Sequence, residues 1–248
     1  MKKHFIVLAA AMMPLAFFSC RKEKIEPRTD NVSLNEVAFR PVNKPSANLD
    51  SGLVGRYEFD GNLKEYSGKL ADAVASISGA DNYTVDRKGN VNRAIKFNGR
   101  YGLDIFKVPL TFNTSVAVWV EYDAIAPSPN YFAKGDQGIL PDFSQDNDNY
   151  WGVVSTPVTS GVPSGSIDNH WHHLVATYDG NELKFYVDGS FIGNSLNPCP
   201  LALPVGATTH CQLGYSTQVG SVWYGSMDDL RYYTRVLSAA DVKSLYKL

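Results

Sequence analysis

The chain has 248 residues, of which 12% are aromatic, and its formal net charge is only −2. Charges of both signs are interspersed, so the sequence lacks the basic surface that nucleic-acid binding requires, and we expect no nucleic-acid partner. Beyond the first nineteen residues no long apolar stripe repeats every 3.6 residues, while Gly and Pro punctuate the chain. This pattern favours an all-β protein.

The first twenty residues predict an exported lipoprotein. Lys2 and Lys3 precede an apolar stretch at 5–18 that is too short to cross a bilayer as a helix, which is typical of a signal peptide at 1–19. The junction before Cys20 resembles the lipobox of bacterial lipoproteins, although Phe17 stands where that motif usually has an aliphatic residue. The resemblance implies acylation of Cys20; secretion without a lipid is the alternative.

Residues 20–51 are polar, charged and interrupted by proline, with little apolar periodicity. Such a composition cannot bury a core and predicts a flexible tether. The folded part is then a single domain at 52–248.

Short apolar segments between turn residues predict the strands. They lie at 53–59, 94–97, 115–122, 150–154, 171–178, 183–187, 210–215 and 224–233. In the first of them, alternation places Leu53, Tyr57 and Phe59 on one face. This spacing is typical of an antiparallel sandwich.

The segment at 170–189 is the clearest hairpin, with turn residues at 179–181. His170 and His172 share one side of its first strand, but no neighbouring carboxylate in the sequence completes a metal-ligand set. We therefore expect no metal here, and expect His173 to be a hydrogen-bonded structural residue of the sandwich.

Cys199 and Cys211 follow the signal peptide and so lie in a compartment that permits disulfides. We expect them to pair and to close a short proline-containing loop. A zinc site with His210 is the alternative, but the sequence offers no obvious fourth ligand.

One helix is predicted, at 239–246. Ser238 is a good N-cap, Asp241 follows three residues later as in a capping box, and Leu237 and Val242 occupy the positions of a hydrophobic staple. We expect this helix to cover one end or edge of the sandwich.

Five motifs in order resemble the laminin G-like, concanavalin A-like jelly-roll domains of secreted bacterial proteins. They are LVGRYEFDGNLKEYSG, AIKFNG, SVAVWVEYD, HWHHLVATYDGNELKFYVDG and GSMDDLRYYTRVLSAADV, within residues 53–248. The resemblance implies an all-β fold, a two-sheet antiparallel jelly-roll sandwich with a short C-terminal helix, and ligands on the concave face or the loop rim. It implies no single activity, because this fold hosts lectins, glycosidases and adhesion domains.

Glycoside hydrolysis needs two carboxylates facing the scissile bond. Laminarinase-like relatives present them on one strand as Glu-x-Asp-x-x-Glu, whereas here Glu121 and Asp123 are followed by Ala126 at the position of the second glutamate. We therefore expect no catalytic residue in this strand.

Asp228 alternates with Leu230 and Tyr232, so a buried face would bury its carboxylate, which then requires a cation or hydrogen-bond donors. The resemblance implies a structural Ca²⁺ held by Asp228 and by the loop around Asp60. Related sequences usually read Asp-x-Ser-Gly-Asn in that region, where this chain has Glu65 and Lys69 at the first and last positions. Backbone N–H groups or a basic side chain bonded to Asp228 are the alternative.

Sugars bind by aromatic stacking combined with directional hydrogen bonds, and the polar segment at 142–151 ends in two aromatic residues. Packing in the core or in turns is the alternative for each aromatic residue. The candidates for a stacking platform are Tyr131, Tyr150, Trp151, Trp223 and Tyr224.

These observations predict a non-catalytic carbohydrate-binding lipoprotein of the bacterial cell envelope, attached by its lipid to the outer membrane, in the periplasm or on the surface. Its partners would be a glycan and the membrane. The alternatives are a divergent glycosidase or polysaccharide lyase on the same fold, and an adhesion or assembly subunit that binds protein.

Overall fold

The computed structural model describes residues 48–77, 82–123, 130–135, 142–145, 150–155, 160–166, 168–196, 203–217 and 221–248. In the strands between 130 and 166 it describes the backbone, together with the side chain of Phe143. Residues 45–248 form one unit. Among the described residues no helix is long and apolar enough to cross a membrane.

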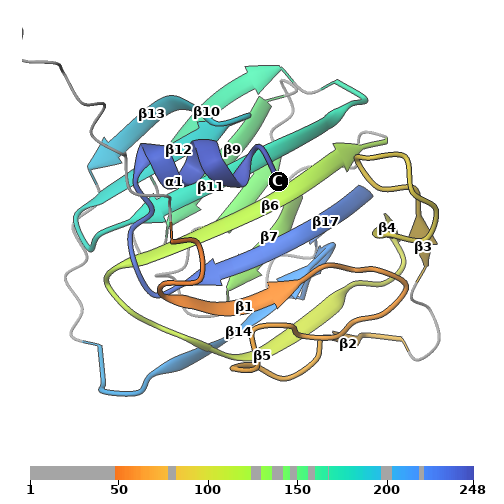
Figure 1. Ribbon diagram of the computed structural model, residues 1–248, viewed down its shortest axis with the longest axis horizontal. Coiled ribbons are helices and arrows are strands. Elements are labelled where there is room, and N and C mark those ends of the chain that lie inside the picture. The colour runs from red at the N-terminus through yellow and green to blue at the C-terminus, as the bar shows by residue number, and fades with distance from the viewer. Residues whose placement is uncertain are drawn as a thin grey trace, which may run out of the picture. The chain divides into compact units, whose positions relative to one another are not determined.

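The described part of the chain forms two large antiparallel sheets (Figure 1). The eight-stranded sheet has the order β13 (Ser190–Leu196), β12 (Glu182–Val187), β11 (Trp171–Tyr178), β6 (Thr114–Tyr122), β17 (Tyr224–Tyr233), β4 (Ala94–Asn98) and β3 (Tyr83–Thr84), with β1 (Leu53–Tyr57) beside β17. Because β17 pairs with β1, β4 and β6, the last strand ties together three distant parts of the chain.

The second described sheet has seven strands. Its order is β10 (Ser160–Ser166), β9 (Tyr150–Ser155), β8 (Asp142–Gln145), β7 (Asn130–Gly135), β14 (Thr208–Leu213), β5 (Leu103–Pro109) and β2 (Val74–Ala75). A small ribbon of β15 (Tyr215–Ser216) and β16 (Ser221–Val222) accompanies it. The all-β fold class predicted from the sequence is confirmed.

The main core lies between the two sheets. It joins residues of the eight-stranded sheet, such as Val118, Phe185 and Leu230, to residues of the seven-stranded sheet, such as Leu103 and Leu213. Strand alternation explains why both sheets contribute to this core, since every second side chain of a half-buried strand points inward. The predicted hairpin is confirmed as β11 and β12, with register set by a tight turn.

The first strand corrects the predicted alternation. A register shift between Leu53 and Gly55 turns Leu53 away from the main core, so that it packs with Tyr233 on the outward face of the eight-stranded sheet. Tyr57 and Phe59 do belong to the main core. A β-bulge reverses the face of every residue before it, which simple alternation does not foresee.

The helix α1 (Ala239–Leu245) has the predicted capping box between Ser238 and Asp241. It lies over the outward face of the eight-stranded sheet and not at an end or edge as expected (Figure 1). Val242 and Leu245 bury against Val175 and its neighbours in a second apolar cluster. The outward face of this sheet is therefore covered in part, and the site described next lies on the same face.

Candidate functional site

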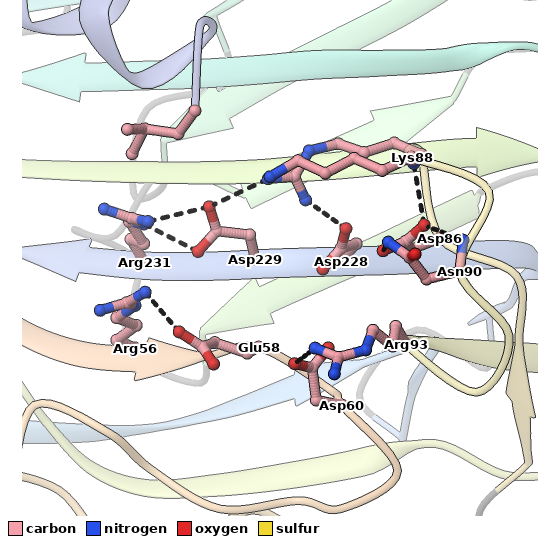
Figure 2. Close-up of a pocket in the computed structure, with 12 residues that line it drawn as sticks. Arg56, Glu58, Asp60, Asp86, Lys88, Asn90, Arg93, Asp228, Asp229 and Arg231 are labelled. Atoms are coloured by element: carbon pink, nitrogen blue, oxygen red, sulfur yellow. Dashed lines mark hydrogen bonds and ion pairs between the residues drawn. The ribbon is translucent and has the colours of Figure 1, made fainter.

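The site is a polar pocket of about 370 Å³ on the outward face of the eight-stranded sheet (Figure 2). It lies on β1 and β17, with the loop at 85–93 along one side. Its lining is almost entirely charged: Arg56, Glu58, Asp60, Asp86, Arg87, Lys88, Asn90, Arg93, Asp228, Asp229, Arg231 and Leu248.

A β-bulge in β17 builds the floor of this pocket. Asp228 pairs with Trp119 and Arg231 with Ala117, which leaves one extra residue on β17, and Asp229 has φ +47°. The bulge turns two successive aspartates to the outward face. This corrects the predicted alternation: Asp228 is 4% exposed, as expected, but it does not share the face of Leu230, which lies in the main core.

The loop at 85–93 carries the principal partner of these aspartates. Asp86 Oδ1 accepts hydrogen bonds from the backbone N–H groups of Lys88 and Asn90, at 2.8 and 2.7 Å, and Gly89 has φ +84°. An Asx turn of this kind fixes the backbone locally. It holds Arg87 across β17, where its guanidinium carbon lies 5.0 Å from the centre of the Trp119 ring.

Two arginines neutralise the floor. Arg87 forms an ion pair with Asp228 and approaches Asp229 at 3.7 Å, while Arg231 binds Asp229 through two hydrogen bonds of 2.8 and 3.0 Å. The four side chains are at most 11% exposed. Burial raises the pKa of Asp228 to about 7, against the opposing effect of Arg87.

The mouth of the pocket is more exposed than its floor and carries both positively and negatively charged side chains. Arg56 forms an ion pair with Glu58, and Arg93 forms one with Asp60 (Figure 2). The side chain of Arg93 is 54% exposed. Within the described part of the chain, the Lys88 ammonium has no ion-pair partner. Donors and acceptors therefore stand side by side around the opening.

The residues predicted to hold Ca²⁺ do not fit a calcium ion. The carboxylates of Asp60 and Asp228 each face an arginine. The Glu65 carboxylate accepts the backbone N–H groups of Arg56, Ser67 and Gly68, which lower its pKa although burial opposes them. In the parts that the structure describes, no three His, Cys, Asp or Glu side chains are grouped to hold a metal.

Comparison with known proteins assigns the family. A model of the Concanavalin A-like lectin/glucanases superfamily matches residues 101–243, more than half of the chain. This chain belongs to that superfamily. Among curated proteins no sequence matches it.

Solved structures share the fold of this concanavalin A-like protein. Domain 4 of AbnA, an extracellular arabinanase from Geobacillus stearothermophilus in complex with arabinotriose, has TM-score 0.63 and 21% identity and covers 79% of this chain and 98% of that one. A mutant of Trypanosoma rangeli sialidase with trans-sialidase activity has TM-score 0.62 and 19% identity, and the match covers 79% of this chain and 32% of the sialidase. Trypanosoma rangeli sialidase in complex with sialic acid has TM-score 0.59 and 19% identity, and that match also covers 79% of this chain and 32% of the sialidase. This chain thus spans about a third of the sialidases.

The predicted stacking residues of the concanavalin A-like protein do not come together in one described site. Trp223 is fully buried and packs against Phe97 with ring centres 5.8 Å apart, so it belongs to the core and its assignment to a platform is corrected. Tyr224 is half-buried over Gly99. Tyr131 lies in β7, and Tyr150 and Trp151 in β9, with side chains outside the described residues.

The histidine-rich strand differs from expectation in two details. Asp168 and Asp188 both bind the His172 ring, at 3.0 and 2.8 Å, so carboxylates do lie near this histidine. His173 is buried as expected, but in the described structure its Nδ1 has no hydrogen-bond partner. Burial lowers the pKa of His173 to about 4.

Three further predictions concern other parts of the chain. Glu121 is half-buried, and burial raises its pKa, while Ala126 lies outside the described residues. Cys211 is buried in β14, but Cys199 lies outside the described residues, so the disulfide stays a prediction. The lipidation site at Cys20 likewise lies outside them.

Sequence reasoning proposed Asp60 and Asp228 as calcium ligands and missed the arginines that they face in the structure. Two signals could have located them. The paired aspartates in an otherwise alternating strand indicate a bulge, and the segment DRKGN at 86–90 combines an Asx-turn residue with a glycine at its fourth position. Nothing in the sequence indicates that Arg87 crosses to β17, because that contact joins segments 141 residues apart.

Proposed function

We propose that this chain is a non-catalytic glycan-binding protein and that the polar pocket binds sugar hydroxyl groups. Membership of a lectin and glucanase superfamily supports a carbohydrate ligand. The arabinanase domain was solved with arabinotriose and the sialidase with sialic acid, which supports the same class of ligand.

The observation that carries the proposal is the pairing of donors and acceptors around the pocket mouth. Arginine offers only donors and a carboxylate only acceptors, whereas a sugar hydroxyl both donates and accepts. A hydroxyl can therefore bridge a pair such as Arg93 and Asp60, with Arg56 and Glu58 as a second pair. The volume of about 370 Å³ lies in the range of small-ligand pockets and is sufficient for one or two sugar residues.

The proposal is tested by glycan-array binding of the purified chain, with calcium and with chelator. Because the mouth carries the contacts, Arg93→Gln and Lys88→Gln should weaken binding about tenfold, the usual loss for a charge-assisted hydrogen bond. The matched control is Lys243→Gln, an exposed lysine on α1 outside the pocket lining. The absence of binding to any glycan in either condition would refute the proposal.

An enzyme is the second candidate, because one observation favours it. The carboxyl of Asp228, with a pKa of about 7, shares the pocket with other carboxylates, and a raised carboxyl pKa is what a general acid requires. Against it, Arg87 binds Asp228 directly in the floor, at only 6% side-chain exposure. Release of reducing sugar that Asp228→Asn abolishes would establish the enzyme; retention on polysaccharide without release supports binding.

We also propose attachment to the bacterial outer membrane through a lipid on Cys20. The signal-like stretch at 5–18 and the lipobox-like junction support it. Two or more acyl chains would give lasting attachment, since each buried methylene contributes about 0.8 kcal/mol. In cell fractionation, the unchanged chain should remain with the membranes and Cys20→Ser should not. If both behave alike, the anchor is not lipid on this residue.

A further inference from the structure

A second cluster of sugar-compatible groups lies on the outward face of the seven-stranded sheet, away from the pocket. In β5, Leu103 and Ile105 enter the core, so Asp104 and Phe106 point outward. In β14, Cys211 enters the core and His210 points outward in the same way. Strand pairing brings these outward residues side by side.

A bulge in β5 places the Phe106 ring against the His210 ring of the neighbouring strand. The register pairs Val108 with Thr209 and Ile105 with Cys211, so that Phe106 and Lys107 together face the single residue His210. Lys107 takes up the extra residue with φ +62°. The Phe106 ring then lies on the His210 ring, with centres 4.6 Å apart and planes 11° from parallel, and the residue stays 45% exposed.

Hydrogen bonds fix the polar side of the cluster. Asp104 Oδ1 accepts from Tyr215 Oη at 2.7 Å and bonds His210 Nε2 at 2.6 Å, with Gln212 Nε2 at 3.5 Å. Gly102 lets the Tyr215 ring come close, since a Cβ there would lie 1.9 Å from that ring. Every such bond falls on Oδ1, and in the described structure no donor lies within hydrogen-bond distance of Asp104 Oδ2.

We propose that Asp104, Phe106 and His210 form a second sugar subsite, which binds a neutral pyranose residue of a polysaccharide. The exposed part of the Phe106 ring would pack against the apolar C–H face of the sugar. Asp104 Oδ2 would accept a hydrogen bond from a hydroxyl, and its negative charge would disfavour uronic acids. The proposal rests on the glycan-binding function but not on the pocket, which lies on the other sheet.

The subsite is tested by NMR titration of the full chain with neutral glucose, mannose and galactose hexasaccharides, following the ring signals of His210. We expect saturable shifts with at least one of them and no shifts with oligogalacturonate. Phe106→Ala should weaken that binding about tenfold, as the loss of one stacking contact predicts, whereas Phe106→Trp should retain it. The control is Phe112→Ala, an exposed phenylalanine that contacts Gly180 instead.

The outcomes separate the two proposals. If hexasaccharides bind and only Arg93→Gln or Lys88→Gln weakens them, the subsite is refuted and the glycan-binding function stands. If the His210 signals shift and Phe106→Ala removes the shift, the subsite is established whatever the pocket does. If no glycan of any class binds, both proposals fail. If Phe106→Ala unfolds at the same temperature as the unchanged chain, misfolding is excluded as the cause of weaker glycan binding.

Discussion

The buried pair of Arg87 and Asp228 is the residue-level feature on which the pocket floor depends. A buried charge without a partner is expensive, and Arg87 is the group that compensates Asp228. Removal of the guanidinium should therefore be costly, and the cost should depend on the protonation of the carboxyl, whose pKa burial raises to about 7.

We predict that Arg87→Met lowers the free energy of unfolding by about 3 kcal/mol at pH 8. The loss should be smaller at pH 5.5, because a protonated Asp228 needs no counter-ion. Urea denaturation at both pH values measures it. The double variant Arg87→Met with Asp228→Asn should recover part of the stability at pH 8; an equal loss at both pH values would contradict this account.

His173 should make the protein less stable at low pH, whereas the loss of Arg87 should cost most at high pH. Its pKa falls from 6.5 to about 4 on folding, so between these values the unfolded chain binds the proton and the folded chain does not. Stability is therefore lost as the pH falls from about 6.5 to about 4. Between pH 7 and pH 5 the unchanged chain should lose about 2 kcal/mol more than His173→Phe, which keeps a ring beside Trp119. Parallel pH profiles for the two chains would show that His173 does not titrate as described.

At the level of elements, the helix α1 converts an exposed sheet face into a second apolar cluster. Its start depends on the capping box, in which Ser238 Oγ accepts from the Asp241 N–H at 3.2 Å and Asp241 Oδ2 accepts from the Ser238 N–H at 3.0 Å. A helix of seven residues has little stability of its own, so its cap and its buried residues decide whether it stays in place.

We predict that Ser238→Ala destabilises the protein by about 1 kcal/mol, the usual value of an N-cap side chain. The midpoint of urea unfolding should fall without a change in its slope. Ser244→Ala is the control, because Ser244 lies in the same helix and its hydroxyl bonds only the preceding turn, at Ala240 O. Equal effects of the two substitutions would show that the capping box contributes nothing.

At the level of the whole molecule, the two sheets present two different outward faces. One carries the charged pocket and α1, and the other carries the Phe106 cluster. Since two packed sheets separate them by roughly 10 Å plus their side chains, a short oligosaccharide cannot contact both. For short ligands the two sites should therefore bind independently, and a substitution in one should leave the affinity of the other unchanged.

The ion pairs predict how the whole protein responds to calcium. Because the carboxylates of Asp60 and Asp228 face Arg93 and Arg87, millimolar CaCl₂ and chelator should give the same melting temperature. Differential scanning calorimetry in both conditions measures it. A rise with calcium that Asp228→Asn abolishes would restore the calcium site inferred from the family resemblance.

The sequence by itself determined the fold class, most of the longer described strands, the hairpin at 170–189 and the capped helix, because periodicity and turn residues act locally. Short or irregular strands such as β5 were not predicted from the sequence, since Phe106 and Lys107 at the bulge of β5 interrupt the alternation of apolar and polar residues. Asp60 and Asp228 were predicted as calcium ligands from the family resemblance, and in the structure both line the polar pocket.

Only the tertiary structure decided what those residues contact. The bulge at Asp229 set the face of the aspartates, and the turn at Asp86 brought Arg87 to them across 141 residues of sequence. The same holds for Phe106 and His210, which meet only because β5 pairs with β14. Local patterns specify elements, whereas the register between distant strands selects which side chains meet, and that selection depends on packing of the whole core.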